Sequence, residues 1–109
     1  MSFTNLEQIP FVGISYEFVG ETQGAPFSMY IVKAPPGRGP ELHTHPYVEV
    51  AVVQEGNATI TVGHEQREVT GGDIVVIPAG TPHRFVNTGS TTLRQIDIHA
   101  SPRFIQMPA

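Results

Sequence analysis

Apolar and β-branched residues recur along this chain in short runs, several of which alternate with polar residues, as expected for strands with one buried face. The runs that we predict as strands cover residues 11–19, 27–34, 47–54, 58–63, 67–70, 73–78, 83–88 and 93–100. The last of these, LRQIDIHA, shows the alternation most clearly. No apolar pattern with helical periodicity continues for more than one turn, so we expect an all-β protein.

Turn-forming segments rich in glycine and proline separate these runs, for example PPGRGPE at 35–41 and AGTP at 79–82. About eight short strands at such spacing predict a sandwich or a barrel. A length of 109 residues fits one domain, which we expect to cover residues 1–109. We expect the last segment, SPRFIQMPA, to be no more than a tail.

Composition and charge exclude several classes of protein. The 11 glycines and 10 prolines suit a turn-rich fold, and the absence of cysteine excludes disulfides and thiolate metal sites. The net charge is −4 and the six Lys and Arg are scattered, so we expect no nucleic-acid partner. No run resembles a signal peptide or a membrane span, so we expect a cytoplasmic location and no contact with membranes.

The segment ELHTHPYVEV, residues 41–50, contains three potential metal ligands. His43, His45 and Glu49 have the same parity, so they project to one side if the strand continues through Pro46. Imidazole and carboxylate together suit a divalent transition metal. An isolated HxH is more often a pair of loop histidines with an exposed glutamate nearby, so the segment alone does not settle the question.

A second segment, GGDIVVIPAGTPHRFVN at 71–87, adds a further histidine. A short apolar strand ends in the stiff turn 78–82, which reverses the chain and fixes the direction of His83 at the start of the next strand. A fourth ligand therefore becomes available on a different strand.

Together the two segments resemble the cupin superfamily, in its small single-domain form. Residues 37–56 match the motif G(X)5HXH(X)3E(X)6G, and residues 72–87 match G(X)5PXG(X)2H(X)3N, in every defining position and spacing. The matching positions are Gly37, His43, His45, Glu49 and Gly56, followed by Gly72, Pro78, Gly80, His83 and Asn87. The segment that contains them is about half of the chain, and the flanking strands fit the rest.

The resemblance implies a double-stranded β-helix, or jelly-roll barrel, of two antiparallel sheets. It also implies that one divalent transition metal ion (Fe, Mn, Zn, Ni or Cu) is bound by His43, His45, Glu49 and His83. Glycines 56, 72 and 80 would then serve tight turns, and Asn87 would be a structural residue at the end of a strand.

The other candidate residues have weaker support. Tyr47 shares the parity of the expected ligands and lies between them, which makes it a weak candidate for a catalytic residue. His99 could face the barrel with Asp97 and donate a hydrogen bond near the ligands, although an edge or surface position is the simpler interpretation. His64 lies in a predicted hairpin turn and should be exposed. The side chains that could line a pocket are Phe27, Met29, Tyr30 and Phe85. Those that could orient a polar or anionic substrate are Gln54, Arg84 and Arg94, although the parity of Arg84 favours the outer face.

Three functions are compatible with the resemblance. The first is a mononuclear metal-dependent enzyme that acts on a small molecule, with dioxygenation of a catechol, flavonol or β-diketone-like compound as the leading hypothesis. The second is a metal-dependent isomerase or epimerase, and the third is a non-catalytic module that binds a sugar or another metabolite. We also expect a homodimer that pairs through residues 11–19, because a small barrel leaves strand edges to be covered.

Overall fold

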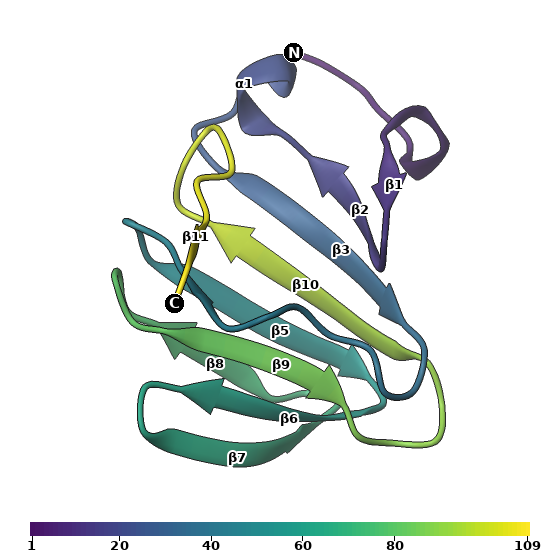
Figure 1. The fold of residues 1–109 in the computed structure, drawn as a ribbon. Helices are drawn as coiled ribbons and strands as arrows, with labels where there is room; N and C mark the ends of the chain where they lie inside the picture. The colour runs from purple at the N-terminus through teal and green to yellow at the C-terminus, as the bar shows by residue number, and fades with distance from the viewer.

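The computed structural model describes residues 1–109, and its regular secondary structure is almost entirely β-strands, in two antiparallel sheets that face each other (Figure 1). The six-stranded sheet contains, in spatial order, β1 (Phe11–Val12), β2 (Ser15–Phe18), β3 (Ser28–Ala34), β10 (Leu93–His99), β5 (Glu49–Glu55) and β8 (Ile74–Ile77). The five-stranded sheet contains β11 (Met107–Pro108), β4 (His43–Thr44), β9 (His83–Asn87), β6 (Asn57–Val62) and β7 (Glu65–Thr70). This arrangement confirms the predicted jelly-roll class.

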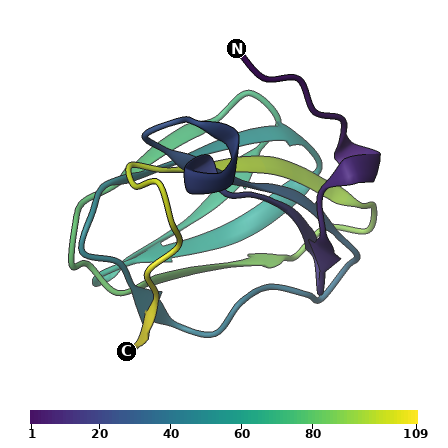
Figure 2. The ribbon, with the colours of Figure 1, turned by 90° about the horizontal axis from the view of Figure 1, so that it is seen from above.

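The helical elements are short. A 3₁₀ turn, η1 (Leu6–Gln8), precedes β1, and a single α-helical turn, α1 (Gly20–Gln23), joins β2 to β3. No helix has the length and apolar character that crossing a bilayer requires. Seen from above, the two chain ends lie on opposite sides of the strands (Figure 2).

Most predicted strands are present, with ends that shift by about one or two residues. The predicted strand at 11–19 is wrong in one respect, because it divides into β1 and β2. Gly13 has a φ of 66°, and the chain folds back there so that Phe11 pairs with Tyr16. The apolar pattern continues across this turn, which is why the pattern alone did not reveal it.

The prediction that residues 101–109 form no more than a tail is also wrong. Met107 pairs with Thr44 in the five-stranded sheet, and the Phe104 ring stacks on Tyr30 with centroids 3.9 Å apart. These contacts join residues that are distant in the sequence, so no local periodicity could indicate them.

The segment with the HxH pattern does not form one continuous strand. His43 lies in β4 of the five-stranded sheet, whereas Glu49 begins β5 of the six-stranded sheet. The chain passes from one sheet to the other around Pro46, so parity within a single strand is not the reason why these side chains share a face. They converge because both strands direct these side chains into the interior between the sheets.

The interior changes character along the strands. The end at which His99 pairs with Ser28 and Glu49 is polar, and we call it the polar end; it contains Ser28, His43, His45, Glu49, His83 and His99. The opposite end, which we call the apolar end, contains Ala34, Val53, Ala58, Val69 and Leu93, all buried in the hydrophobic core. The polar end therefore carries the chemistry, and the apolar end carries much of the packing.

Two motif residues have the expected structural roles. Gly56 joins β5 to β6 with a φ of 94°, and a Cβ there would lie 2.9 Å from the Thr92 carbonyl oxygen, so the position needs both the conformation and the size of glycine. The Asn87 Nδ2 donates to the carbonyl oxygens of Ala34 (2.9 Å) and Thr91 (2.8 Å). Asn87 thereby connects the end of β9 to the end of β3 and to the following loop.

Candidate metal centre

Four side chains at the polar end, those of His43, His45, Glu49 and His83, are buried and place their ligand atoms within 4.8 Å of one another. His83 is the first residue of β9 and pairs with His43 of β4, while Glu49 opens β5 in the opposite sheet. Both sheets therefore contribute to the cluster, which could hold a metal ion.

Backbone carbonyl groups determine the tautomer of all three imidazoles. The Nδ1 atoms of His43, His45 and His83 lie 2.6, 2.7 and 2.8 Å from the carbonyl oxygens of Glu41, Ile105 and Thr81, respectively. A carbonyl oxygen can only accept, so each Nδ1 carries a proton and each neutral ring leaves the lone pair of Nε2 free. Neutral imidazoles with a free Nε2 are suitable ligands for a transition metal.

The contacts between the histidines and Glu49 require a cation. Glu49 Oε1 lies 3.1 Å from Nε2 of both His45 and His83. The buried Nε2 of His45 has no hydrogen-bond partner. Two lone pairs that face a carboxylate repel it unless a proton or a metal ion lies between them. The donor set therefore fits a divalent transition metal ion.

The ionisation of the cluster agrees with this fit. Burial raises the pKa of Glu49, but the close contacts with the imidazoles of His45, His83 and His99 outweigh it and lower the pKa to about 2. Burial is also the main reason why the pKa of His43 is lowered. For His83 burial is the largest single cause and acts to lower the pKa, but the hydrogen bonds to Glu49 and to the Thr81 carbonyl oxygen and the charge of Glu49 together outweigh it, so the pKa is raised. A metal ion would therefore compete with a proton at His83.

His99 is next to the cluster but carries its proton on the other nitrogen. The Ile105 N–H donates to the Tyr47 hydroxyl oxygen (3.3 Å), and this hydroxyl lies 2.6 Å from His99 Nδ1. The Tyr47 hydroxyl cannot donate to His45 Nδ1, because this nitrogen already donates to the Ile105 carbonyl oxygen. The hydroxyl group therefore donates to His99 Nδ1. The proton of His99 is then on Nε2, 3.3 Å from Glu49 Oε1. His99 therefore faces the carboxylate with a protonated nitrogen and differs in this from the three other histidines.

The simpler interpretation of His99, an edge or surface position, is wrong. Its strand β10 lies between β3 and β5 in the six-stranded sheet, and the side chain is 1% exposed. Burial is the main cause that lowers the pKa of His99 to about 4. The order of strands within a sheet depends on pairings between distant residues, so the sequence did not distinguish a central strand from an edge.

Tyr47 lies behind the histidines. Its ring stacks on that of His45 with centroids 5.0 Å apart and an angle of 10° between the planes, and it does not line the cavity beside the cluster. The hydroxyl group is hydrogen-bonded to His99, as described above. The position suits a residue that holds His45 and His99 in place. His64 is exposed in the turn between β6 and β7, as predicted.

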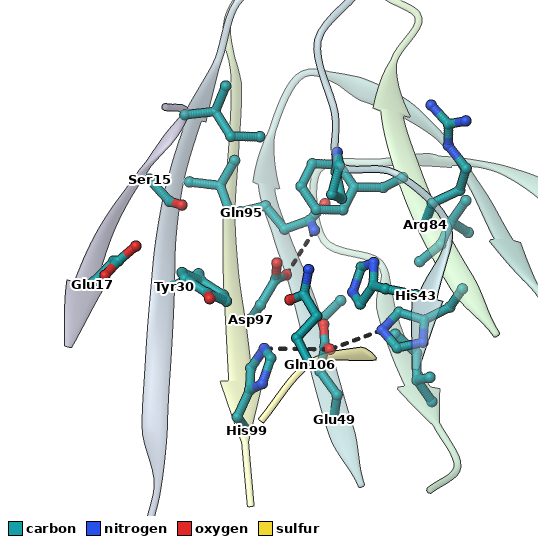
Figure 3. A pocket seen from close by; sticks show the side chains of 18 of the residues that line it. Ser15, Glu17, Tyr30, His43, Glu49, Arg84, Gln95, Asp97, His99 and Gln106 are labelled. Atoms are coloured by element: carbon teal, nitrogen blue, oxygen red, sulfur yellow. Dashed lines mark hydrogen bonds and ion pairs between the residues drawn. The ribbon is translucent and has the colours of Figure 1, made fainter. Parts of the chain in front are cut away.

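A cavity of about 200 Å³ opens beside the cluster and extends between the sheets. His43, Glu49 and His83 form part of its wall, and the neighbouring polar lining includes Ser15, Glu17, Tyr30, Gln95, Asp97 and Gln106 (Figure 3). Tyr30 and Phe85 line the cavity, as the sequence suggested, whereas Phe27, Met29, Gln54 and Arg94 do not. Arg84 is among the lining residues, but its guanidinium group points away from Glu49 and Asp97 in Figure 3.

The sequence analysis did not single out Gln95, Asp97 or Gln106 as site residues. Gln95 and Asp97 alternate with apolar residues on β10 and share the inward parity of His99, so the signal was present. Polar residues at inward positions usually indicate either a hydrogen-bonded core group or a site, and parity alone does not decide between the two. No such signal exists for Gln106, which belongs to the segment taken for a tail.

Comparison with known proteins agrees with the fold and the cluster. The family model described as the cupin domain matches residues 30–99, which include the four clustered residues. The chain belongs to the cupin family. This cupin is 30% identical to the uncharacterized protein YrkC of Bacillus subtilis (strain 168) over 86 residues, which are 72% of the chain and 46% of YrkC. It is 40% identical to the uncharacterized protein SCO3923 of Streptomyces coelicolor over 58 residues, covering 53% and 54% of the two chains. The chain thus spans about half the length of these curated relatives.

Solved structures with the same fold include enzymes of oxalate metabolism. An oxalate oxidase in complex with the substrate analogue glycolate has a TM-score of 0.69 and 25% identity, and the match covers 75% of this cupin and 45% of the oxidase. A mutant of the oxalate decarboxylase OxdC from Bacillus subtilis has a TM-score of 0.82 and 23% identity, covering 94% of this cupin and 30% of that chain. A protein from Bacillus halodurans, BH2720, is 29% identical with a TM-score of 0.68, covering 73% and 66% of the two chains. The decarboxylase likeness concerns the fold alone.

Proposed function

We propose that this cupin is a mononuclear metal-dependent enzyme that acts on a small molecule, with His43, His45, Glu49 and His83 as the metal ligands. Dioxygenation is the reaction that we favour. A divalent ion held by these residues would act as a Lewis acid, and iron or manganese would add redox chemistry with dioxygen.

The position of the cluster in a cavity wall carries this proposal. Three of the four ligand residues line the cavity of about 200 Å³, so a small molecule inside it can approach the ion directly. An ion that only stabilises the fold is more often surrounded completely by protein ligands. The access from the cavity favours a functional site.

The surrounding residues have separate tasks in this proposal. The carbonyl groups at 41, 81 and 105 hold the imidazole rings by their Nδ1 protons, so that the lone pairs need no rearrangement on binding. His99 packs against the carboxylate, with Nε2 3.3 Å from Glu49 Oε1. Apolar residues on the far side of the cavity, among them Val32, Ile60 and Phe85, exclude bulk water.

Metal analysis followed by oxygen consumption tests the proposal. Purified protein should contain one divalent transition metal ion per chain by elemental analysis, and the loaded protein should consume oxygen with at least one member of a panel of diols and diketones. The His45→Ala variant should do neither, and His64→Ala, an exposed histidine, should behave like the wild type. A metal content that survives in His45→Ala would reject the assigned ligands.

The same assays separate the alternative functions. Conversion of a sugar without oxygen consumption would identify an isomerase or epimerase. Ligand binding to the metal-loaded protein without any turnover would identify a binding module, a function that no specific contact in the structure favours. Both results would retain the metal site and reject the dioxygenase.

We further propose a cytoplasmic homodimer, and the outer face of the six-stranded sheet supports the dimer. Outward side chains form two continuous apolar rows across paired strands: Ile74, Val52, Ile96 and Ile31, and Val76, Val50, Ile98 and Met29. Ile74 and Val76 are 65% and 61% exposed. The rows continue into Tyr16 and Phe18 of the segment in which the sequence placed the contact. An apolar face of this extent is typical of an interaction surface.

Light scattering of the wild type at micromolar concentration should give twice the mass of one chain. Val76→Lys should shift the population towards the monomer, because an ammonium group would have to be buried in the interface. Gln66→Lys, on an exposed position of the other sheet, should leave the dimer intact. A monomeric wild type would reject the dimer.

A further inference from the structure

Gln95 and Asp97 form a buried polar pair in the cavity that the metal cluster does not use. Both side chains point inward from β10, and they are 1% and 3% exposed. Gln95 Nε2 donates to Asp97 Oδ1 at 2.7 Å (Figure 3). Both residues line the same cavity as His43, Glu49 and His83.

One atom of this pair has no partner. The amide oxygen of Gln95 is buried and accepts no hydrogen bond, although buried amide oxygens in folded proteins almost always do. Asp97 forms no ion pair with any Lys, Arg or His side chain within 4.0 Å. The pair therefore leaves one acceptor, the Gln95 amide oxygen, without a hydrogen bond beside the cavity.

The charges around the cavity restrict what can fill this place. The side chains of Glu17 and Glu49 line the cavity, burial raises the pKa of Asp97 well above its usual range and keeps its carboxyl group neutral, and the guanidinium group of Arg84 points away from Glu49 and Asp97 in Figure 3. A second carboxylate on a ligand has no hydrogen to donate and would repel the Gln95 oxygen. A hydroxyl group can donate a hydrogen bond to the Gln95 oxygen and fits without that repulsion.

We propose that Gln95 and Asp97 form a recognition subsite for a hydroxyl group of the ligand, so that the substrate is a hydroxylated small molecule and not a dicarboxylate. This inference rests on the proposed function, because it places the other end of the same ligand at the metal centre. Gln95 is then a specificity-determining residue: a site built to hydrogen-bond a hydroxyl group binds an analogue without it poorly, since its buried acceptor stays unpaired.

A pair of matched probes tests the subsite without reference to turnover. Glycerate and lactate carry the same α-hydroxycarboxylate group for the metal and differ in one additional hydroxyl group on glycerate. Isothermal titration calorimetry with zinc-loaded protein should show tighter binding of glycerate by about tenfold, as expected for one hydrogen bond to a buried acceptor. Oxalate, a dicarboxylate, should bind more weakly than glycerate.

Variants then assign the preference to the subsite. Gln95→Met keeps the length of the side chain but cannot accept in the same way, so it should reduce the ratio of the two affinities to near one while lactate affinity stays unchanged. Gln66→Met, on the exposed surface of β7, should keep the tenfold ratio.

The outcomes distinguish the two proposals. Absence of zinc binding by elemental analysis would reject the metal centre and, with it, the subsite. Zinc binding with equal affinities for glycerate and lactate in the wild type, or with no binding of either probe, would overturn the subsite alone. A tenfold ratio that persists in folded Gln95→Met would also overturn it. The wild-type ratio needs no variant, so it remains decisive if Gln95→Met does not fold.

Discussion

The two ends of the barrel interior are built on the same strands and have opposite properties. On β10 the inward side chains run from Leu93 at the apolar end, through Gln95 and Asp97, to His99 at the polar end. Leu93 is fully buried among apolar side chains, whereas Glu49 at the other end contacts three imidazoles within 3.3 Å. The comparison shows how one scaffold separates packing from chemistry: the apolar end stabilises the fold, and the polar end can hold groups that destabilise it.

The polar end destabilises the fold because it buries polar atoms. Buried polar atoms without partners, such as His45 Nε2, destabilise a protein by about 1–3 kcal/mol each. The apolar end must offset this cost through buried surface. If this division is correct, changes at the two ends should affect metal binding and stability differently.

The largest effect should come from His45→Ala at the polar end. The change removes one of the neutral ligands, and we expect no metal to remain after dialysis, whereas the wild type retains one ion per chain. The change also removes a buried ring and the hydrogen bond from Nδ1 to the Ile105 carbonyl oxygen, so the metal-free variant should melt below the metal-free wild type. Elemental analysis measures the metal content and thermal melts by circular dichroism measure the stability, and a variant that retains its ion would contradict the role of the polar end.

Glu49→Gln should have a smaller effect on binding than His45→Ala. The variant keeps the shape of the side chain and an oxygen that can bind the ion, but it removes the negative charge of the ligand set. We expect partial metal occupancy, with redox or acid–base behaviour shifted by the greater positive charge that remains on the ion. Metal titration with a competing chelator gives the loss in affinity, and an unchanged affinity would show that the carboxylate is not a ligand.

Leu93→Ala tests the apolar end. The side chain is fully buried in the core, so its truncation should lower the free energy of unfolding by about 2–5 kcal/mol. Folded Leu93→Ala should still bind one metal ion per chain, since the residue does not line the cavity beside the cluster. Urea denaturation and elemental analysis provide the two values. Loss of metal from the folded variant would mean that the two ends are coupled.

Removal of the metal from the wild type should leave the fold intact. The strands and the core do not depend on the ion, so the far-ultraviolet spectrum should persist after chelation. Chelation should remove only the stabilisation that comes from metal binding, about 3 kcal/mol when the ion is in hundredfold excess over Kd. The melting temperature should therefore fall by an amount on the order of 10 to 20 °C. A random-coil spectrum after chelation would instead make the ion structural.

The smallest effect concerns pH in the metal-free protein. Burial, together with nearby imidazoles, lowers the pKa of His99 from 6.5 to about 4. Between these values the unfolded chain binds more protons at this residue than the folded one, so stability falls as pH decreases from 6.5 to 4. The shift sets an upper limit of about 3 kcal/mol for this contribution. Urea melts at pH 7 and pH 4.5 should show a smaller pH-dependent loss in His99→Gln than in the wild type, and identical losses would refute the assignment.

Much of this protein was determined by local features of the sequence. The alternation of apolar and polar residues predicts most of the strands, and it works because a strand with one buried face must repeat every second residue. Glycine and proline at fixed positions specify the turns, as at Gly56, where no other residue fits the conformation and the space. The spacing of His43, His45, Glu49 and His83 identified the cluster that the structure then brings together.

Tertiary structure alone decided how these parts meet. Residues around Pro46 carry the chain between sheets, so the cluster forms across two sheets and not on one strand. The central place of β10 buried His99 with Nε2 3.3 Å from Glu49 Oε1, and it put Gln95, with its free amide oxygen, in the wall of the cavity. The C-terminal segment supplies the Ile105 carbonyl group that determines the tautomer of His45, 60 residues earlier in the chain. Each of these contacts joins residues far apart in sequence, and its energy depends on a geometry that no local pattern encodes.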